Sequence, residues 1–122
     1  MAEAARFSPT RRSPRFAPSR PVTVAMSKDG ASYMYGVVAN LSEGGACFQT
    51  NAVPRHDLLD VLMSFYDGEY VQTTGRVVWA HSDEGLAAVG VEFTNLTDEA
   101  REYLRSNFDS EAFTPVEPQP QT

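Results

Sequence analysis

Three arginines lie within five residues near the start of the chain. Arg11, Arg12 and Arg15 stand in a segment that also contains Pro14 and few apolar side chains. A guanidinium group forms paired hydrogen bonds with phosphate or with the O6/N7 edge of guanine, and its flat face stacks on a purine. Because Arg11 and Arg15 are four residues apart, an extended segment lets them reach different parts of one ligand. We therefore interpret the segment as one that binds a planar anion.

A second polar segment follows about 25 residues later, at a turn between two strand-like runs. Asn40 and Ser42 are separated by one residue, which puts both side chains on the same face of a strand. One amide and one hydroxyl can read the polar edge of a base. Gly44 and Gly45 carry no Cβ atom, so a ring or a phosphate can approach the backbone closely there. Together the two segments predict a site for an anionic, guanine-like ligand.

The charges are unevenly distributed along the chain. Residues 1–20 carry five arginines against one glutamate, whereas the rest of the chain has five basic and fifteen acidic side chains. A basic arm on an acidic body favours docking on that body, or the binding of a small anion there. Duplex nucleic acid is disfavoured, because its phosphates would face the acidic body.

Composition argues against several other classes of protein. The two histidines, His56 and His81, have no second ligand at metal spacing and no nucleophile nearby, so we expect neither a metal site nor catalytic residues. The single cysteine, Cys47, cannot form an internal disulfide, which indicates a reducing, cytoplasmic compartment. No apolar run approaches the roughly 20 residues that span a bilayer, and residues 1–20 lack the apolar stretch of a secretory signal.

Short runs of β-branched and aromatic residues, separated by turn residues, predict an all-β core. The predicted strands are residues 22–26, 32–39, 46–50, 69–81 and 86–93. A further run, residues 58–66, fits helix or strand by pattern. The Asp67-Gly68 turn signal that follows it favours a strand. We expect Trp79 and Cys47 to lie in the core, because alternating strand positions are usually buried.

One helix and two irregular ends complete the predicted organisation. Thr97 is a candidate N-cap, and apolar residues then recur at helical spacing until about Ser110. Residues 1–20 are expected to form a flexible arm, residues 21–110 a small antiparallel barrel with its helix, and residues 111–122 a disordered tail. The chain is one domain with two tails.

The order and separation of the polar residues resemble the PilZ domain family. Its signature is Arg-x-x-x-Arg followed, after a pair of strands, by (Asp/Asn)-x-Ser-x-x-Gly. Arg11 and Arg15 match the first part, and Asn40, Ser42 and Gly45 match the second. The resemblance covers about residues 11–108. It includes the strand-like stretches 75–79 and 90–93 outside the two motifs.

The resemblance implies a fold, a ligand and a mechanism. PilZ domains are six-stranded β-barrels that bind the bacterial dinucleotide cyclic di-GMP. By this resemblance, Arg11, Arg12 and Arg15 would contact guanines and phosphates, Asn40 and Ser42 would bind a guanine, and the two glycines of the second motif would leave room for it. The arm would move onto the barrel when ligand binds and would alter the surface offered to a protein partner.

Two rival functions are weighed against a cyclic di-GMP receptor. A PilZ-like adaptor would bind only proteins, and such members usually lack the motif arginines that this chain retains. A nucleic-acid-binding barrel would carry basic and aromatic residues across a sheet face, whereas the body of this chain is acidic. We expect a receptor, not an enzyme, that acts in trans on motility, pili, exopolysaccharide or related output. We expect it to be a monomer or a weak dimer.

Overall fold

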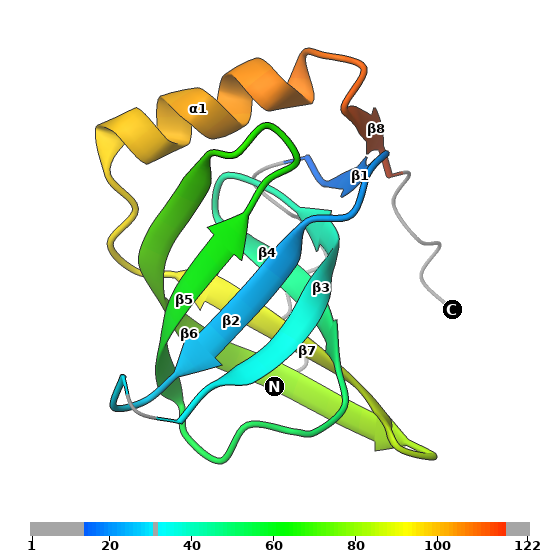
Figure 1. Cartoon of the computed structure of the whole chain (residues 1–122), viewed down its shortest axis with the longest axis vertical. Coiled ribbons are helices and arrows are strands. Elements are labelled where there is room, and N and C mark those ends of the chain that lie inside the picture. Colours follow the sequence, from blue (N-terminus) through cyan, green and yellow to red (C-terminus); the bar gives the residue numbers. More distant parts are fainter. Residues whose placement is uncertain (1–13, 31, 117–122) are drawn as a thin grey trace, which may run out of the picture.

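The computed structural model describes residues 14–30 and 32–116. The elements in these ranges are, in chain order, β1 (Phe16–Pro18), β2 (Thr23–Ser27), β3 (Met34–Leu41), β4 (Gly45–Thr50), β5 (Leu58–Ser64), β6 (Tyr70–Asp83), β7 (Leu86–Phe93), α1 (Asp98–Phe108) and β8 (Phe113–Pro115). Six of the strands close into an antiparallel barrel, and α1 lies across one end of it (Figure 1).

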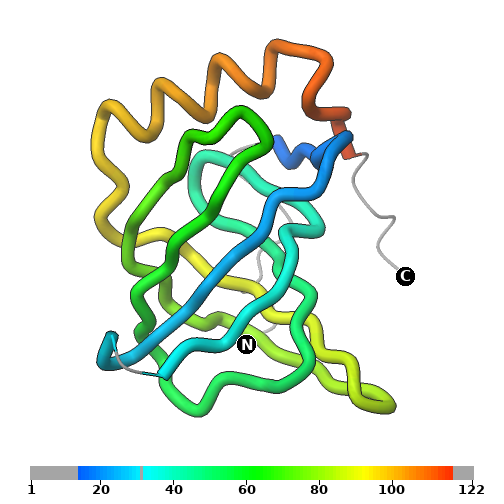
Figure 2. The backbone as a smooth tube through the Cα atoms, in the orientation of Figure 1, coloured from blue at the N-terminus to red at the C-terminus, as the bar shows by residue number. Residues whose placement is uncertain are grey.

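The barrel strands follow the order β2-β5-β6-β7-β4-β3, and β3 pairs back with β2 to close the cylinder. The closing pair runs from Thr23 opposite Val37 to Met26 opposite Met34. The tube in Figure 2 traces the chain through the barrel in sequence order, with consecutive strands joined mostly by short turns. The predicted all-β fold, a six-stranded barrel with a C-terminal helix, is confirmed.

Alternation of exposed and buried side chains explains why these runs form strands. In β5, Leu59, Val61 and Met63 are buried and the residues between them face outward. The strand therefore fills the barrel with one face, and the predicted choice of strand over helix for this run is confirmed. The turn after it contains Gly68 with a φ of 90°, a backbone conformation that glycine adopts without strain.

The helix begins and docks as its sequence predicts. The Thr97 side chain accepts a hydrogen bond of 3.1 Å from the backbone N–H of Ala100, so Thr97 is the N-cap. Leu104 is fully buried and seals the end of the barrel. Tyr103 donates a hydrogen bond of 2.9 Å to Asp67, so α1 is also held to the β5–β6 turn. The helix ends at Phe108, two residues before the predicted end.

Two short strands lie in segments that were predicted to be irregular. β1 pairs with β8 from Phe16 opposite Pro115 to Pro18 opposite Phe113, and Phe16 also pairs with Leu41 of β3. Figure 1 shows this small pair beside the C-terminal end of α1. Each strand is only three residues long, and Phe16 and Phe113, at which they begin, are 97 positions apart in the chain. Local patterning therefore gave no sign of them.

The β6–β7 hairpin continues beyond the barrel. From position 78 onward every β6 side chain is exposed, and Figure 1 shows the hairpin turn projecting away from α1. The prediction that Trp79 lies in the core is wrong, because a β-bulge after Val77 re-aims the strand and no core lies beneath this part of it. Cys47 is also outside the core: it stands half-buried between the inward-facing Ala46 and Phe48.

Candidate functional site

The two polar segments of the sequence meet in the structure. Arg15 immediately precedes β1, and the pairing of Phe16 with Leu41 brings it beside the end of β3. Its Nη1 atom donates a hydrogen bond of 2.7 Å to Oδ1 of Asn40. The bond joins residues 25 positions apart in the chain. The predicted convergence of an arginine and an amide is therefore present in the described part of the chain.

The Ser42 side chain forms its hydrogen bonds within the β3–β4 turn. Its side-chain oxygen accepts hydrogen bonds of 3.2 Å from the N–H groups of Gly44 and Gly45 and donates one of 3.3 Å to the carbonyl of Gly45. The residue is only 4% exposed. In this structure the hydroxyl shapes the turn. A direct contact between Ser42 and a guanine stays a prediction.

The two glycines of the turn have different surroundings. A Cβ atom at Gly45 would lie 2.3 Å from the backbone oxygen of Val91, so β4 and β7 pack too closely for any side chain there. A Cβ atom at Gly44 would meet nothing within 4 Å. Gly45 therefore has a structural reason to be glycine, whereas Gly44 leaves an open approach to the turn.

Strand pairing extends from Asn40 across the outer face of the barrel. Asn40 lies opposite Cys47, Cys47 opposite Gly90, and Gly90 opposite Trp79. Directly paired residues point to the same face of a sheet. These residues form one row across β3, β4, β7 and β6, which we call the outer row. Arg15 stands at one end of it and Trp79 at the other.

Trp79 is the functional candidate that the sequence analysis missed. Its indole lies directly over Gly90, where a Cβ atom would be 2.2 Å from Nε1, yet Trp79 remains 47% exposed. An exposed indole face can stack on a nucleobase. The sequence did contain a signal for this arrangement, namely the turn residues Glu84 and Gly85. A two-residue turn there sets the register of the β6–β7 hairpin and so places Trp79 opposite Gly90.

The middle of the outer row is small and neutral. Burial raises the pKa of the Cys47 thiol, and the nearby Arg15 guanidinium only partly opposes this effect. The thiol is therefore protonated at neutral pH. Cys47 thus forms a low, uncharged surface between the Arg15 guanidinium and the Trp79 indole, which itself covers Gly90. Such a surface suits a flat, polar ring system better than a branched or bulky ligand.

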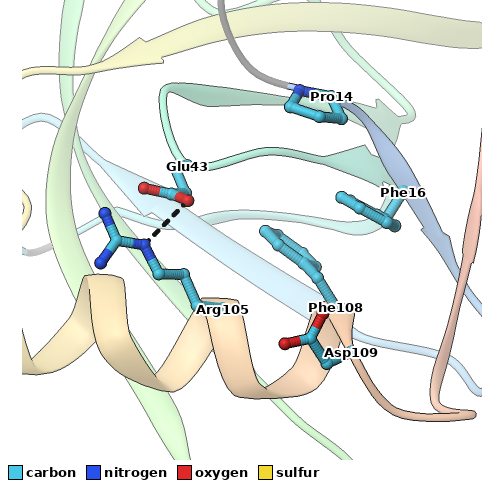
Figure 3. A pocket seen from close by; sticks show the side chains of 6 residues that line it. All are labelled: Pro14, Phe16, Glu43, Arg105, Phe108 and Asp109. Carbon is cyan, nitrogen blue, oxygen red and sulfur yellow. Dashed lines mark hydrogen bonds and ion pairs between the residues drawn. The ribbon is translucent and has the colours of Figure 1, made fainter.

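A cavity of about 220 Å³ lies between the β1 segment, the β3–β4 turn and α1 (Figure 3). Figure 3 shows the side chains that line it: Pro14, Phe16, Glu43, Arg105, Phe108 and Asp109. Phe16 and Phe108 stack with ring centroids 4.4 Å apart, and Nε of Arg105 donates a 3.0 Å hydrogen bond to Glu43. Cavities for drug-sized ligands usually measure about 300–1,000 Å³, so this one is too small to enclose a dinucleotide.

The described residues contain no group of three or more His, Cys, Asp and Glu side chains placed to hold a metal ion. In the same ranges, no helix combines the length and the apolar character needed to cross a membrane.

The sequence pattern of a known family matches almost the whole of this barrel and its helix. The model of the PilZ domain matches residues 9–109. The chain belongs to the PilZ domain family.

Solved PilZ structures share the fold of this chain. The PilZ domain of YcgR from Escherichia coli, solved with c-di-GMP, has a TM-score of 0.65 at 15% identity, over 78% of this chain and 86% of that one. The Bacillus subtilis inhibitor of motility MotI/DgrA has a TM-score of 0.65 at 11% identity, over 84% and 53%. The K. pneumonia MrkH–c-di-GMP complex has a TM-score of 0.65 at 15% identity, over 80% and 49%.

The present chain spans about half the length of MotI/DgrA and of MrkH. A comparison with curated protein sequences gives no match. At these identities, the similarity to the solved structures shows the fold of this PilZ domain alone.

In this PilZ domain, the second motif is described in full and the first only in part. Asn40, Ser42, Gly44 and Gly45 all lie at or beside the β3–β4 turn. Arg15 lies at the same place, whereas Arg11 and Arg12 fall outside the described residues. The family signature thus accounts for one end of the outer row, and Trp79 at its other end lies outside both motifs.

Proposed function

We propose that this PilZ domain is a receptor for cyclic di-GMP and that the ligand lies along the outer row. The observation that carries the proposal is the 2.7 Å hydrogen bond between Arg15 and Asn40, which unites the two motifs at one end of that row. Family membership supports it, as do the solved structures of YcgR and MrkH in complex with c-di-GMP.

The chemistry of the row suits a guanine dinucleotide. Arg15 offers a planar fork for the O6/N7 edge of guanine, a contact worth roughly 1–3 kcal/mol. Asn40 adds an amide, which can donate and accept. At the far end Trp79 offers an aromatic face, and stacking of a base on such a face contributes about 1–3 kcal/mol. Between them, Cys47 presents a small side chain, so a flat ligand can lie close to the sheet beside the indole that covers Gly90.

The remaining motif residues act in the proposal as follows. Arg11 and Arg12 precede the fixed position of Arg15 and bind the phosphates, so the segment before β1 closes over the ligand. Gly44 leaves the approach beside Asn40 open. Because β1 is paired with β3 and β8, the change on binding is confined to the chain that precedes it.

This receptor breaks no covalent bond and so works as a signalling protein, not as an enzyme. We propose that ligand binding alters a surface that a protein partner recognises in trans. Motility, pili, exopolysaccharide or a related process is the expected output. MotI/DgrA is an inhibitor of motility and MrkH a transcription regulatory factor, so outputs of more than one kind occur among proteins of this fold.

One observation favours a second function, a PilZ adaptor that binds proteins and no cyclic di-GMP. The Arg15 guanidinium already donates a hydrogen bond to the Asn40 amide without a ligand. A ligand must replace that bond, which reduces the net gain from binding. If the replacement is unfavourable, the same residues serve to hold β1 against the barrel.

Calorimetric titration of the full chain with cyclic di-GMP separates the two functions. Arg15→Ala removes the proposed contact and should weaken binding by roughly 5- to 150-fold, the equivalent of 1–3 kcal/mol. Arg55→Ala is the matched control, because it removes the same charge from an exposed loop that follows β4, at the end of that strand away from Gly45. It should leave the affinity unchanged.

Saturable binding that Arg15→Ala weakens and Arg55→Ala retains supports the receptor. Absence of heat and of any thermal shift with excess ligand refutes it and leaves the adaptor. Equal weakening in both variants refutes the proposed site, because it would mean that the ligand responds only to overall charge.

A further inference from the structure

The projecting part of β6 has a strand on one side only. β5 pairs with β6 from Tyr70 to Arg76, and β7 pairs with it along its whole outer length. The last bond on the β5 side joins the N–H of Val77 to the carbonyl of Asp57 at 2.7 Å. Beyond that bond, the side of β6 away from β7 is an open sheet edge.

The geometry of the hairpin turn tells which backbone groups face this edge. Glu84 and Gly85 have φ values of 52° and 85°, as in a two-residue type I′ turn. The flanking residues Asp83 and Leu86 are then a hydrogen-bonded pair, and bonded pairs alternate along an antiparallel ladder. Ala80 and Ser82 therefore turn their N–H and C=O groups away from β7. Across the described ranges, these groups have no hydrogen-bond partner.

The sequence of the edge lacks the lysine and proline that most often discourage pairing with another strand. Natural sheet edges are usually protected by lysine, proline, very short strands or a covering segment. The stretch from Val77 to Asp83 contains no lysine, arginine or proline. Val78 is 54% exposed, and Trp79 beside it is nearly as accessible. The edge is thus long, partly apolar and open.

We propose that this edge pairs with the same edge of a second copy of the chain, antiparallel and about a two-fold axis at Ala80. Identical edges satisfy each other in such an arrangement, because every residue that faces outward meets an outward-facing residue of the other copy. In this register Trp79 lies opposite His81 of the second copy. Asp83 lies opposite Val77, so the two Asp83 carboxylates are at opposite ends of the pair.

The negative charge of the chain favours this register over others that would bring acidic side chains of the two copies together. The formal net charge is −6, and two acidic bodies repel unless their contact separates the acidic side chains. Within the projecting part of β6, Asp83 is the sole acidic residue, and the register keeps it away from its counterpart. The contact is small, which is typical of a weak, concentration-dependent dimer. This inference does not rest on the proposed ligand.

Sedimentation velocity over a range of concentrations of the full chain tests the dimer. The weight-average mass should rise from that of a monomer toward twice that value. Ala80→Pro removes an outward N–H that makes no bond to any of the described residues, and Ala80→Lys puts a charge at the two-fold axis. Both should remain monomeric. Gln72→Lys adds the same charge at an exposed position in the part of β6 that pairs with β5, and this variant should still dimerise.

Cross-linking tests the register directly. A hydrogen-bonded antiparallel pair has Cα atoms about 5.5 Å apart, within the range that a disulfide bridges. In a Cys47→Ser background, Ala80→Cys should therefore form a covalent dimer on mild oxidation, whereas Gln72→Cys should not. This measurement does not depend on whether Ala80→Pro folds.

A wild-type chain that stays monomeric at every concentration, with no selective cross-link at position 80, overturns the proposal. A dimer that persists in Ala80→Lys also overturns it, because the contact would then lie on another face.

Discussion

Separate alanine substitutions at Gly44 and Gly45, the two glycines of the β3–β4 turn, distinguish an effect on folding stability from an effect on ligand binding. A Cβ atom at Gly45 would lie 2.3 Å from the carbonyl oxygen of Val91, whereas ordinary contacts begin at 3.4 Å. The obstacle is backbone that is itself paired with β4, so no flexible side chain can move to relieve it. Overpacking of this kind costs about 1–3 kcal/mol. Gly45→Ala is therefore expected to be clearly destabilised.

The matched variant is Gly44→Ala, one residue earlier in the same turn. Its Cβ atom would meet nothing within 4 Å, and among the described residues Gly44 is not one of those with positive φ. The backbone there is fixed by the 2.8 Å bond from the N–H of Phe93 to the Gly44 carbonyl. We expect a change in stability within about 0.5 kcal/mol.

Thermal unfolding followed by circular dichroism measures the difference. For a domain of this size, 1 kcal/mol shifts the melting temperature by roughly 4–8 °C. Gly45→Ala should thus melt roughly 5–20 °C below the wild type, and Gly44→Ala close to it. Equal melting temperatures for the two variants would refute the steric reasoning. A change in cyclic di-GMP affinity of a stable Gly44→Ala protein would then report on ligand contact alone.

Four further variants test the fold and the outer row. Leu104→Ala should lower the free energy of unfolding by about 2–5 kcal/mol in urea titrations, because it empties the site where α1 seals the barrel. Thr97→Ala should cost about 1 kcal/mol by the same measurement, since a first-turn N–H loses its acceptor. Arg15→Gln should slow alkylation of Cys47 at a fixed pH above 8, because losing the guanidinium raises the thiol pKa further and leaves less thiolate. Trp79→Ala should weaken cyclic di-GMP binding by about 1–3 kcal/mol in calorimetry.

Conservative variants serve as controls for three of these four. Leu104→Met preserves volume and should cost less than about 1.5 kcal/mol. Thr97→Ser retains a capping hydroxyl and Trp79→Phe a stacking ring, so each should keep most of the wild-type property. Alkylation of Cys47 that is as fast or faster in Arg15→Gln contradicts the assigned electrostatics. Unchanged affinity in Trp79→Ala removes that residue from the site.

The barrel could be predicted because each strand carries its own evidence. Leu59, Val61 and Met63 alternate with outward-facing residues, and the Asp67-Gly68 turn marks the end of their run. β1 and β8 could not be predicted in this way. Their residues become strands only because the folded barrel brings two distant segments together, and that information is tertiary.

The candidate site was predictable in its composition but less so in its geometry. The spacing of Arg15 and Asn40 indicated a shared site, and the two side chains do meet. The hydroxyl of Ser42 faces its own turn, a local hydrogen-bond pattern that competes with any ligand contact. Trp79 was misjudged because alternation tells which way a side chain points and not whether the strand still has a core beneath it.

The pairing of β1 with β8 has a mechanical consequence. Phe16 lies opposite Pro115 and Pro18 opposite Phe113, so both chain segments leave the barrel from the same end of the pair. Tension between them would open these bonds one after another, as in unzipping, and would not load them all at once in shear. The 2.9 Å bond from the N–H of Val116 to the carbonyl of Arg15 would be among the first to carry the force. A force applied to the two chain segments would thus act on Arg15, and on its hydrogen bond to Asn40, before it acted on the barrel.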